Sequence, residues 1–373
     1  MKVTIIGGSL GGLAAGLLLD DLGCYVHIHE KSDGLMNDRG AGIVMQQETM
    51  SLLEWAREDS ARDLSVACRT RRYLRRDGST AEEMAMPQRF TSWDAIYRTL
   101  RGAFPAERYH VGSRLVGLEN GASQVRARFA DGSSAESDLL VGADGVDSVV
   151  RAHFLPEAKP TYTGYVAWRG VLPEQEAPPH LIAEFKDRFT FFQYPQSHIL
   201  CYLIPGIGGA TTPGERRLNW VWYNNYREGA ELDELLTDRD GHKRGYSVPP
   251  GAVQEKWLSD LRERSKALAP QFRTLVEKTA QPFVQAILDL SVPEMAFGNA
   301  CLLGDAAFVP RPHTAASTSK AIGNAMDLAA ALKRAGKNLQ EALAAWEPLQ
   351  IQIGQQLAAS GQMMGNRSQF GSS

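Results

Sequence analysis

The fold is decided by residues 2–30, which read KVTIIGGSLGGLAAGLLLDDLGCYVHIHE. The apolar run from Lys2 to Ile6 ends in glycine, and residues 10–22 are apolar on all sides, as expected of a helix buried against a sheet. Residues 25–30 alternate in character and predict a second strand. Strand, helix and strand in this order indicate a βαβ unit, and therefore a mainly parallel sheet.

The turn inside this unit suits a dinucleotide. It reads GGSLGG over residues 7–12, where glycines let backbone N–H groups approach a pyrophosphate at the helix N-terminus. Ser9 replaces the middle glycine of the strict GxGxxG pattern, but its small side chain can still lie beside a phosphate. Glu30, at the end of the second strand, stands where an acid accepts hydrogen bonds from a ribose. A glycine-rich turn without a ligand is the alternative.

Two later motifs also place an acid at the end of a strand. GADGVDSVVR, residues 142–151, follows an apolar strand and opens a helix, and LLGDAA, residues 302–307, precedes a helix predicted from His313 to Ala335. Asp305 and a helix N-terminus aimed into one crevice would hold a sugar-like chain. Ordinary helix starts are the alternative, with Asp144 as an N-cap or proline in the first turn.

The rest of the chain predicts a second sheet of a different kind. Strands rich in Tyr, Trp, Phe and Val are expected at residues 164–172, 189–194, 199–204 and 218–226, and helices at 231–236, 253–268 and 339–361. We therefore expect an α/β protein in which an antiparallel sheet domain, residues 71–92 and 161–282, is inserted into a nucleotide-binding domain, residues 1–70, 93–160 and 283–373. The interface of two such domains is a usual place for a small-molecule pocket.

Composition excludes several partner classes. Lys and Arg number 40 and Asp and Glu 43, so the net charge of -3 offers no general attraction for nucleic acid or anionic membranes. No apolar run approaches the roughly 20 residues that span a bilayer, and the glycine-interrupted residues 2–19 do not resemble a signal peptide. The four cysteines have no metal-like spacing and suit a reducing compartment. We expect a cytoplasmic protein without a metal site.

The three motifs together resemble a known family. GxSxGG, then GADGxxSxxR, then GDAA followed by proline and a long helix are similar to the single-component, group A flavoprotein aromatic hydroxylases, and the resemblance covers nearly the whole chain. It implies an FAD-binding Rossmann-like domain with an inserted substrate sheet and a helical C-terminus. It also implies a monooxygenase that uses NAD(P)H and O2 to hydroxylate a small aromatic or hydroxypyridine ring through a flavin C4a-hydroperoxide. A homodimer is one assembly that the sequence leaves open.

The resemblance implies which residues bind FAD. The glycine-rich turn would surround the pyrophosphate, Asp305 would bind the ribitol, and residues 312–317 would place N–H groups near the flavin pyrimidine edge. Asp144 would serve the region shared by FAD and the nicotinamide cofactor. The implied cofactor-binding residues are Gly7, Ser9, Leu10, Gly11, Gly12, Glu30, Lys31, Arg39, Arg98, Asp144, Gly304, Asp305, Ala315, Ala316 and Ser317.

The chain departs from the family pattern near the implied flavin site. Trp93 stands where many relatives have arginine, and Phe308 where many have histidine. Ala315, Ser317 and Gly323 replace parts of the usual helix entry. These departures concern how the flavin is positioned rather than whether it binds.

Five side chains are candidates for binding the ring. His313 leads, because Pro312 would place it at a helix start beside the flavin edge, where an imidazole could accept a proton from a ring hydroxyl. The other candidates are Tyr202, Tyr223, Arg169 and His198. Each also has a structural interpretation: a tyrosine as a wall, an arginine as an ion-pair partner, a histidine as a packed core residue.

Three other functions remain open at this point. A flavin halogenase or a reductase of the same fold superfamily would share the cofactor motifs, although the lysine that halogenases usually carry in the sheet motif is missing. A non-catalytic protein that binds flavin or another small molecule is the third.

Overall fold

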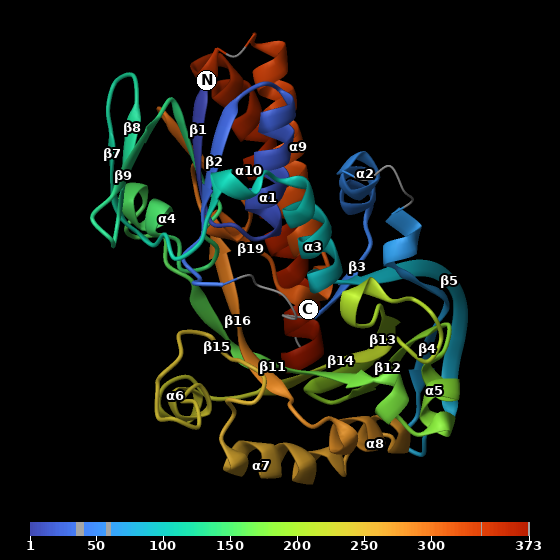
Figure 1. Ribbon diagram of the computed structural model, residues 1–373. Helices are drawn as coiled ribbons and strands as arrows, with labels where there is room; N and C mark the ends of the chain where they lie inside the picture. The colour runs from blue at the N-terminus through green and yellow to red at the C-terminus, as the bar shows by residue number, and fades with distance from the viewer. Residues whose placement is uncertain (35–40, 57–60, 337, 372–373) are drawn as a thin grey trace.

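The computed structural model describes residues 1–34, 41–56, 61–336 and 338–371. Two main sheets dominate it, with the first sheet above the second in Figure 1. The first sheet has the order β17 (Ala296–Phe297), β18 (Ala300–Leu302), β10 (Leu139–Gly142), β1 (Lys2–Ile6), β2 (Tyr25–His29) and β6 (Tyr109–His110). All neighbours in this sheet are parallel except β17 and β18.

Helices and a small sheet cover the two faces of the first sheet. In Figure 1, α1 and α9 lie on one side, and α4 with a three-stranded sheet lies on the other. The bounds are α1 (Leu10–Asp21), α2 (Gln47–Ala56), α3 (Trp93–Ala103), α4 (Val149–Phe154), α9 (Ser317–Arg334), α10 (Leu339–Phe370), β7 (Leu115–Asn120), β8 (Val125–Phe129) and β9 (Ser134–Ser137). Strand β1 and most of α1 are buried, because α1 packs between the sheet and α9. The predicted βαβ unit is therefore confirmed.

The second sheet is larger and mostly antiparallel. Its order is β15 (Ser247–Val248), β16 (Phe283–Ser291), β11 (Thr161–Pro173), β14 (Arg217–Asn225), β13 (Ser197–Ile204), β12 (Arg188–Tyr194), β4 (Val66–Leu74), β5 (Thr80–Ser92) and β3 (Gly42–Val44), and β19 (Phe308–Val309) pairs with β16. Only β12 and β4 run parallel among these pairs of the described chain. Strands β4 and β5 thus join a sheet whose other long strands come much later in the sequence.

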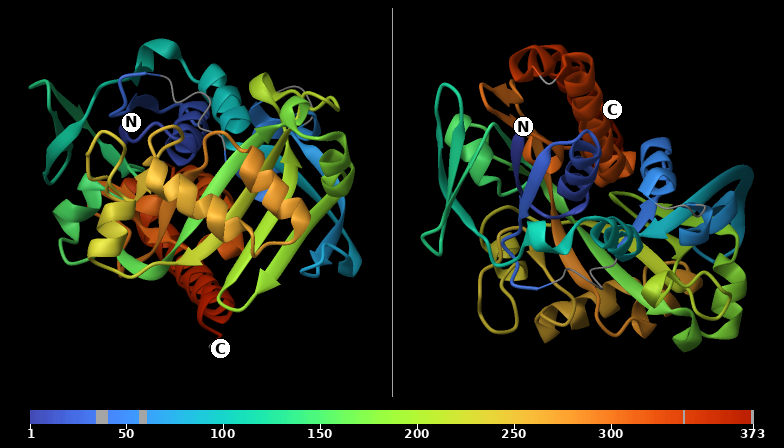
Figure 2. Two further views of the ribbon diagram at one scale, coloured as in Figure 1. Left: turned by 90° about the horizontal axis from the view of Figure 1, so that it is seen from below. Right: turned by 45° about the horizontal axis from the view of Figure 1, so that its top comes forward.

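The two faces of the second sheet have different neighbours. The outer face is covered by α5 (Pro179–Phe185), α6 (Ala230–Leu235), α7 (Glu255–Ser265) and α8 (Pro270–Lys278), and the left view of Figure 2 shows α7 and α8 lying across its strands. Trp168, Trp220 and Trp222 fill the core on that side. Because side chains alternate along a strand, the residues between them face the first sheet instead.

The two sheets are tied together at several points. Asp94 of α3, fully buried, accepts hydrogen bonds from Arg98 and from Arg217 of β14, each at 3.0 Å. At the end of α10, the Gln369 carbonyl accepts a hydrogen bond from Asn225 of β14 at 3.0 Å. No helix in the described part of the chain combines the length and the apolar character that crossing a bilayer requires.

The structure departs from three sequence predictions. The helix expected from His313 begins at Ser317, because Pro312–Thr314 form a 3-10 turn and Ala315 is left-handed, with φ of 52°. Strand β16 pairs with β11 although we placed residues 283–373 in the nucleotide-binding domain, and β4 begins before residue 71. The division into two domains otherwise stays a prediction.

Candidate active site

A cavity of about 2040 Å³ lies between the first and second sheets. One wall is formed by the glycine-rich turn before α1, the residues around Asp305 and the turn at 312–317. The floor is formed by the inward-facing residues of β11, β12, β13, β14 and β4. Pockets for drug-sized ligands measure about 300–1,000 Å³, so this cavity has room for a dinucleotide and a further ring.

The glycine-rich turn fits a pyrophosphate. Ser9, Leu10 and Gly11 line the cavity at the start of α1, where the first N–H groups of a helix lack partners within the helix. The turn has no room for a larger residue at Gly8, where a Cβ atom would lie 2.2 Å from the Tyr109 hydroxyl oxygen. The same hydroxyl donates a hydrogen bond to the Gly8 carbonyl at 2.8 Å. Tyr109 therefore fixes the backbone of the turn from behind.

Glu30 braces the same turn. Its carboxylate accepts hydrogen bonds from the backbone N–H groups of Gly8 at 2.8 Å and Ser32 at 2.9 Å. Glu30 is buried and is not among the cavity-lining residues. Its contact with a ribose stays a prediction, whereas its support of the turn is direct.

Asp144 supports the start of α4 from within the second motif. It accepts hydrogen bonds from the Ser148 hydroxyl at 2.5 Å and the Val149 N–H at 2.7 Å. Burial raises the pKa of Asp144, although these hydrogen bonds act in the opposite direction. Ala143 and Gly145 beside it line the cavity, but Asp144 does not. The N-cap residue of α4 is Ser148, whose hydroxyl accepts a hydrogen bond from the Arg151 N–H at 2.9 Å, so Asp144 supports the helix start without being its N-cap.

Arg151 connects the second motif to the third. Its buried guanidinium donates to the carbonyl oxygens of Val146 at 2.6 Å, Ala158 at 3.0 Å and Ala306 at 3.1 Å. Ala306 directly follows Asp305, so Arg151 holds the Asp305 segment in place. We did not single out Arg151 from the sequence, although its fixed position in GADGxxSxxR was the available signal.

Asp305 presents a carboxylate oxygen to the cavity. Its Oδ1 accepts hydrogen bonds from the Ser317 hydroxyl at 2.7 Å and from the Lys320 ammonium at 3.0 Å. Lys320 also donates to the Phe308 carbonyl, and its side chain is only 1% exposed, against 37% for Asp305. Burial lowers the pKa of Lys320, while the neighbouring Asp305 raises it. With both donors on Oδ1, Oδ2 is left for a ribityl hydroxyl, which fits FAD.

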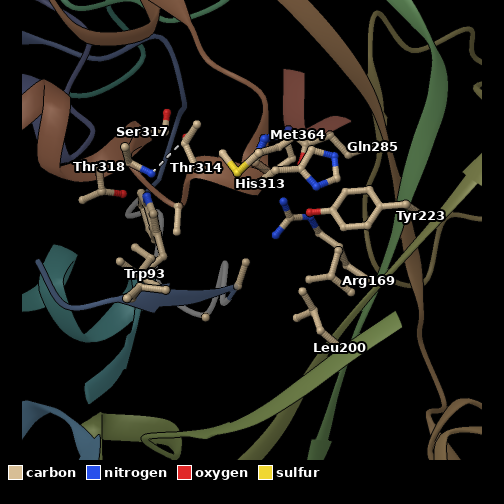
Figure 3. Close-up of a pocket in the computed structure, with 18 of the residues that line it drawn as sticks. Trp93, Arg169, Leu200, Tyr223, Gln285, His313, Thr314, Ser317, Thr318 and Met364 are labelled. Atoms are coloured by element: carbon tan, nitrogen blue, oxygen red, sulfur yellow. Dashed lines mark hydrogen bonds between the residues drawn. The ribbon is translucent and has the colours of Figure 1, made fainter. Parts of the chain in front are cut away.

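The ring end of the cavity is a cluster of tyrosines and histidines. His313 Nε2 lies 2.9 Å from the Tyr165 hydroxyl oxygen, and its ring centroid is 4.6 Å from that of Tyr223. The His198 ring lies tilted against that of Tyr223 with a centroid distance of 4.7 Å, and its Nδ1 is hydrogen-bonded to the Ser368 hydroxyl at 2.6 Å. Figure 3 shows the Tyr223 ring beside that of His313. Tyr165 was missed by sequence reasoning, although it lies on an expected strand as the candidates Tyr202 and Tyr223 do.

Burial keeps these groups uncharged. Burial, with the charges of His198 and Arg311, lowers the pKa of His313 to about 3, and burial lowers that of His198 to about 4. Burial raises the pKa of Tyr223 to about 12. Near neutral pH, His313 therefore acts as a hydrogen-bonding group and does not store a proton.

Tyr202 forms a wall of the same cavity. Its ring stacks on Phe90 with a centroid distance of 4.1 Å. A Cβ atom on Gly42 would lie 2.7 Å from the Tyr202 hydroxyl oxygen, so the tyrosine packs directly against the backbone of β3. Burial raises its pKa well above that of a free tyrosine.

The structure brings together most, but not all, of the residues expected from the sequence. Those that line the cavity are Ser9, Leu10, Gly11, Arg169, His198, Tyr202, Tyr223, Gly304, Asp305, His313, Ala315, Ala316 and Ser317. Those that do not are Gly7, Gly12, Glu30, Lys31, Arg98 and Asp144. Arg98 is instead paired with Asp94. Arg39 lies outside the described residues.

Comparisons with known proteins agree with this geometry. The family described as FAD binding domain-like matches residues 162–289. The chain is 38% identical over 376 residues to 2,6-dihydroxypyridine 3-monooxygenase of Paenarthrobacter nicotinovorans, covering 100% of this chain and 92% of the relative. It is 25% identical over 358 residues to 6-hydroxynicotinate 3-monooxygenase of Pseudomonas fluorescens, covering 91% and 84% of the two chains.

A solved structure matches over the whole chain. The structure of 2,6-dihydroxypyridine-3-hydroxylase from Arthrobacter nicotinovorans superposes with a TM-score of 0.94 at 37% identity, covering 100% of this chain and 93% of that one. The two chains thus share one fold over their matched length. The chain therefore belongs to the FAD-dependent aromatic hydroxylases, which are flavoprotein monooxygenases.

Proposed function

We propose that this chain hydroxylates a small N-heteroaromatic ring that already carries a hydroxyl group, with NAD(P)H as the reductant. The relatives reported above are named for 2,6-dihydroxypyridine and 6-hydroxynicotinate, both of them hydroxylated pyridines. The observation that carries the proposal is the cluster of Tyr165, His198, Tyr223 and His313 beside the turn at 312–317. These side chains offer hydrogen bonds to a flat, polar ring at the place where the flavin edge is expected.

The overall reaction is Ar–H + O2 + NAD(P)H + H⁺ → Ar–OH + H2O + NAD(P)⁺. FAD, when bound, relays the electrons and activates oxygen. The side chains of this protein have the remaining tasks, which are to hold the ring, to orient its hydroxyl group and to keep water away.

His313 is assigned the orienting role. Its Nε2 is engaged by Tyr165, which fixes the plane of the imidazole and leaves Nδ1 for a ligand. With its pKa at about 3, His313 stays neutral and can exchange a hydrogen bond with a ring hydroxyl without keeping the proton. Tyr223 is protonated near neutral pH and can donate to a ring oxygen or nitrogen.

The floor of the cavity keeps the ring dry. Phe189 lies with its ring centroid 4.3 Å from that of Phe191 and 5.1 Å from that of Tyr202, and Leu200 packs beside them. An apolar wall of this kind keeps water out of the active site and so prevents side reactions of reactive intermediates.

The test is a panel of hydroxylated pyridines and matched phenols given to the FAD-loaded protein. We expect a hydroxypyridine to accelerate NAD(P)H oxidation and to yield a product heavier by one oxygen atom. One O2 should be consumed for each NAD(P)H oxidised and each product formed. NAD(P)H oxidation that no ring accelerates would indicate a binding protein, and acceleration without an oxygenated product would indicate a reductase. Comparing kcat/KM for NADH and NADPH then identifies the reductant.

A histidine variant tests the assignment of the cluster. His313→Gln should retain FAD but hydroxylate slowly, with NAD(P)H oxidation diverted to peroxide, because the ring is no longer oriented. Hydrogen-bonding and proton-transfer groups in such positions typically contribute about 10²–10⁴-fold to rate. Coupled turnover within a few-fold of wild type would remove His313 from the proposal.

We also propose that the protein works in the cytoplasm. Its four cysteines are free and buried, as expected in a reducing compartment. The homodimer stays a prediction, and light scattering of the purified protein tests it.

A further inference from the structure

We infer that Arg169 selects the ring substrate in its anionic form by binding an ionised ring oxygen. The inference rests on the proposed function and adds the charge state of the substrate to it. Arg169 lies on β11 opposite Val221 of β14 and lines the cavity. In Figure 3 its guanidinium and the Tyr223 hydroxyl point into the same part of the cavity, next to His313.

The first argument is that no hydrogen bond or ion pair joins Arg169 to the described residues. Its Nε atom is buried without a hydrogen bond, and no carboxylate of the described residues forms an ion pair with it. An arginine stays charged at any physiological pH and offers five N–H donors in one plane. Arg169 is half-buried on the cavity wall, so a guanidinium with no counter-charge among the described residues is placed to bind an anionic oxygen of a ligand.

The second argument comes from the other charges around the cavity. Asp305 is the sole acid among the described lining residues, and Lys320 neutralises it. Four other arginines line the cavity. Arg217 and Arg244 each have an aspartate partner, Arg367 is exposed to solvent, and Arg71 lies on β4, four strands away from β11. Arg169 thus keeps an uncompensated positive charge at the end of the cavity where the ring cluster lies.

The third argument concerns the groups that face Arg169. They are Tyr223 of β14, Tyr202 of β13, Gln285 of β16 and His313, all of which are uncharged near neutral pH. The charge of Arg169 lowers the pKa of both tyrosines, but burial outweighs it and keeps them protonated. None of these groups competes with a ligand anion for Arg169.

The charge of Arg169 should make the site prefer the anionic form of the ring over the neutral form. An opposite charge within about 4–6 Å lowers the pKa of an acid by about 1–3, which equals a 10- to 1,000-fold preference for the anion. A planar guanidinium also fixes the direction of an oxygen that it binds with two N–H groups. An ionised ring is more electron-rich, which favours electrophilic oxygen transfer to it.

The test uses 2,6-difluorophenol bound to the FAD-loaded protein without NAD(P)H, so that no turnover occurs. The fluorine chemical shift of this probe changes when its hydroxyl group ionises, and fluorine NMR therefore reports the charge state of the bound ring. We expect the pKa of the bound probe to lie about 1–3 below that of the free probe. Arg169→Met should abolish this shift and weaken binding of the anion about 10- to 1,000-fold, while Arg169→Lys should retain part of both.

Arg71→Met is the matched control. Arg71 lies on β4, lines the same cavity and also has a buried Nε without a hydrogen bond. Strands β14, β13 and β12 separate it from β11, which is about 19 Å at 4.7–4.9 Å per strand. Its loss removes the same charge from the cavity but should leave the pKa of the bound probe unchanged.

Two outcomes overturn the inference. One is a bound probe that stays neutral in the wild type or ionises equally in Arg169→Met. The other is an equal effect of Arg71→Met, which would point to the general field of the cavity. In both cases, unchanged FAD content and circular dichroism must show that the variants are folded. A protein that binds the anion but hydroxylates no ring would refute the proposed function and leave this inference standing.

Discussion

Replacing Arg151 with methionine would test how the second and third motifs are joined. Methionine fills a similar volume but donates no hydrogen bond to the carbonyl oxygens of Val146, Ala158 and Ala306. Two of these residues, Val146 and Ala306, are buried, so their carbonyls would be left without a partner or water. Each buried, unsatisfied group costs about 1–3 kcal/mol, and we expect a loss of about 2–6 kcal/mol in the free energy of unfolding.

Urea unfolding followed by circular dichroism measures this loss, with and without FAD. Because Ala306 directly follows Asp305, the Kd for FAD, measured by flavin fluorescence, should also increase. Arg151→Lys is the matched control: it keeps the charge and can reach one carbonyl, so both values should fall between those of wild type and Arg151→Met.

Two results would count against this reasoning. Stability within about 0.5 kcal/mol of wild type, which is ordinary for a surface substitution, would show that the three hydrogen bonds do not matter. A large loss of stability with an unchanged Kd for FAD would show that Arg151 supports α4 alone and does not place the Asp305 segment.

Three further predictions concern the cofactor turn and the buried histidines. Asp305→Ala should keep its circular dichroism spectrum but bind FAD about 10- to 150-fold more weakly, the equivalent of one hydrogen bond to a charged group; an unchanged Kd contradicts the ribitol assignment. Gly8→Ala should lose about 1–3 kcal/mol in urea unfolding, because the new methyl group overlaps Tyr109; a variant as stable as wild type rules out the close contact. The pKa values of His198 and His313 are about 4 and about 3, below the 6.5 of an unfolded histidine. Between about pH 7.5 and about pH 5 the unfolded chain therefore binds more protons than the folded one, so the urea concentration at the unfolding midpoint should fall as the pH is lowered from about 7.5 to about 5. A midpoint that does not change with pH would exclude burial of both neutral rings.

Local signals located the nucleotide-binding unit correctly. The elements expected at residues 2–6, 10–22 and 25–30 correspond to β1, α1 and β2 within a residue at each end. Each is specified by its own apolar pattern and by the glycines between them, so no distant part of the chain is needed to predict it.

The turn at 312–317 could not be placed in the same way. Proline followed by helix-forming residues predicts a helix from His313, but Ala315 adopts a left-handed conformation that only the folded surroundings impose. Its carbonyl accepts a hydrogen bond from the Gln46 side chain at 3.0 Å, a residue far away in the sequence. The helix start thus depends on a tertiary contact.

The sequence predicted residues that line the ring end of the site, but not which of them contact one another. His313, Tyr223 and Arg169 were candidates, yet whether an arginine on a strand has an acidic partner is decided by which strands come together. Tyr165 differs in sequence from no other strand tyrosine and acquires its role from its distance to His313. Contacts and ion pairs between strands depend on how the sheet is assembled.

The parallel pairing of β4 with β12 has a consequence for how the chain assembles during synthesis. Residues 66–74 emerge from the ribosome long before residues 188–194. The β4 edge of the β4–β5 hairpin therefore stays unpaired until β12 has been synthesised. Pairings between such distant segments are slow to form, and an unpaired edge strand is a site of aggregation. Strand β4 reads VACRTRRYL, and its three arginines, Arg69, Arg71 and Arg72, give that edge a positive charge that repels other nascent copies.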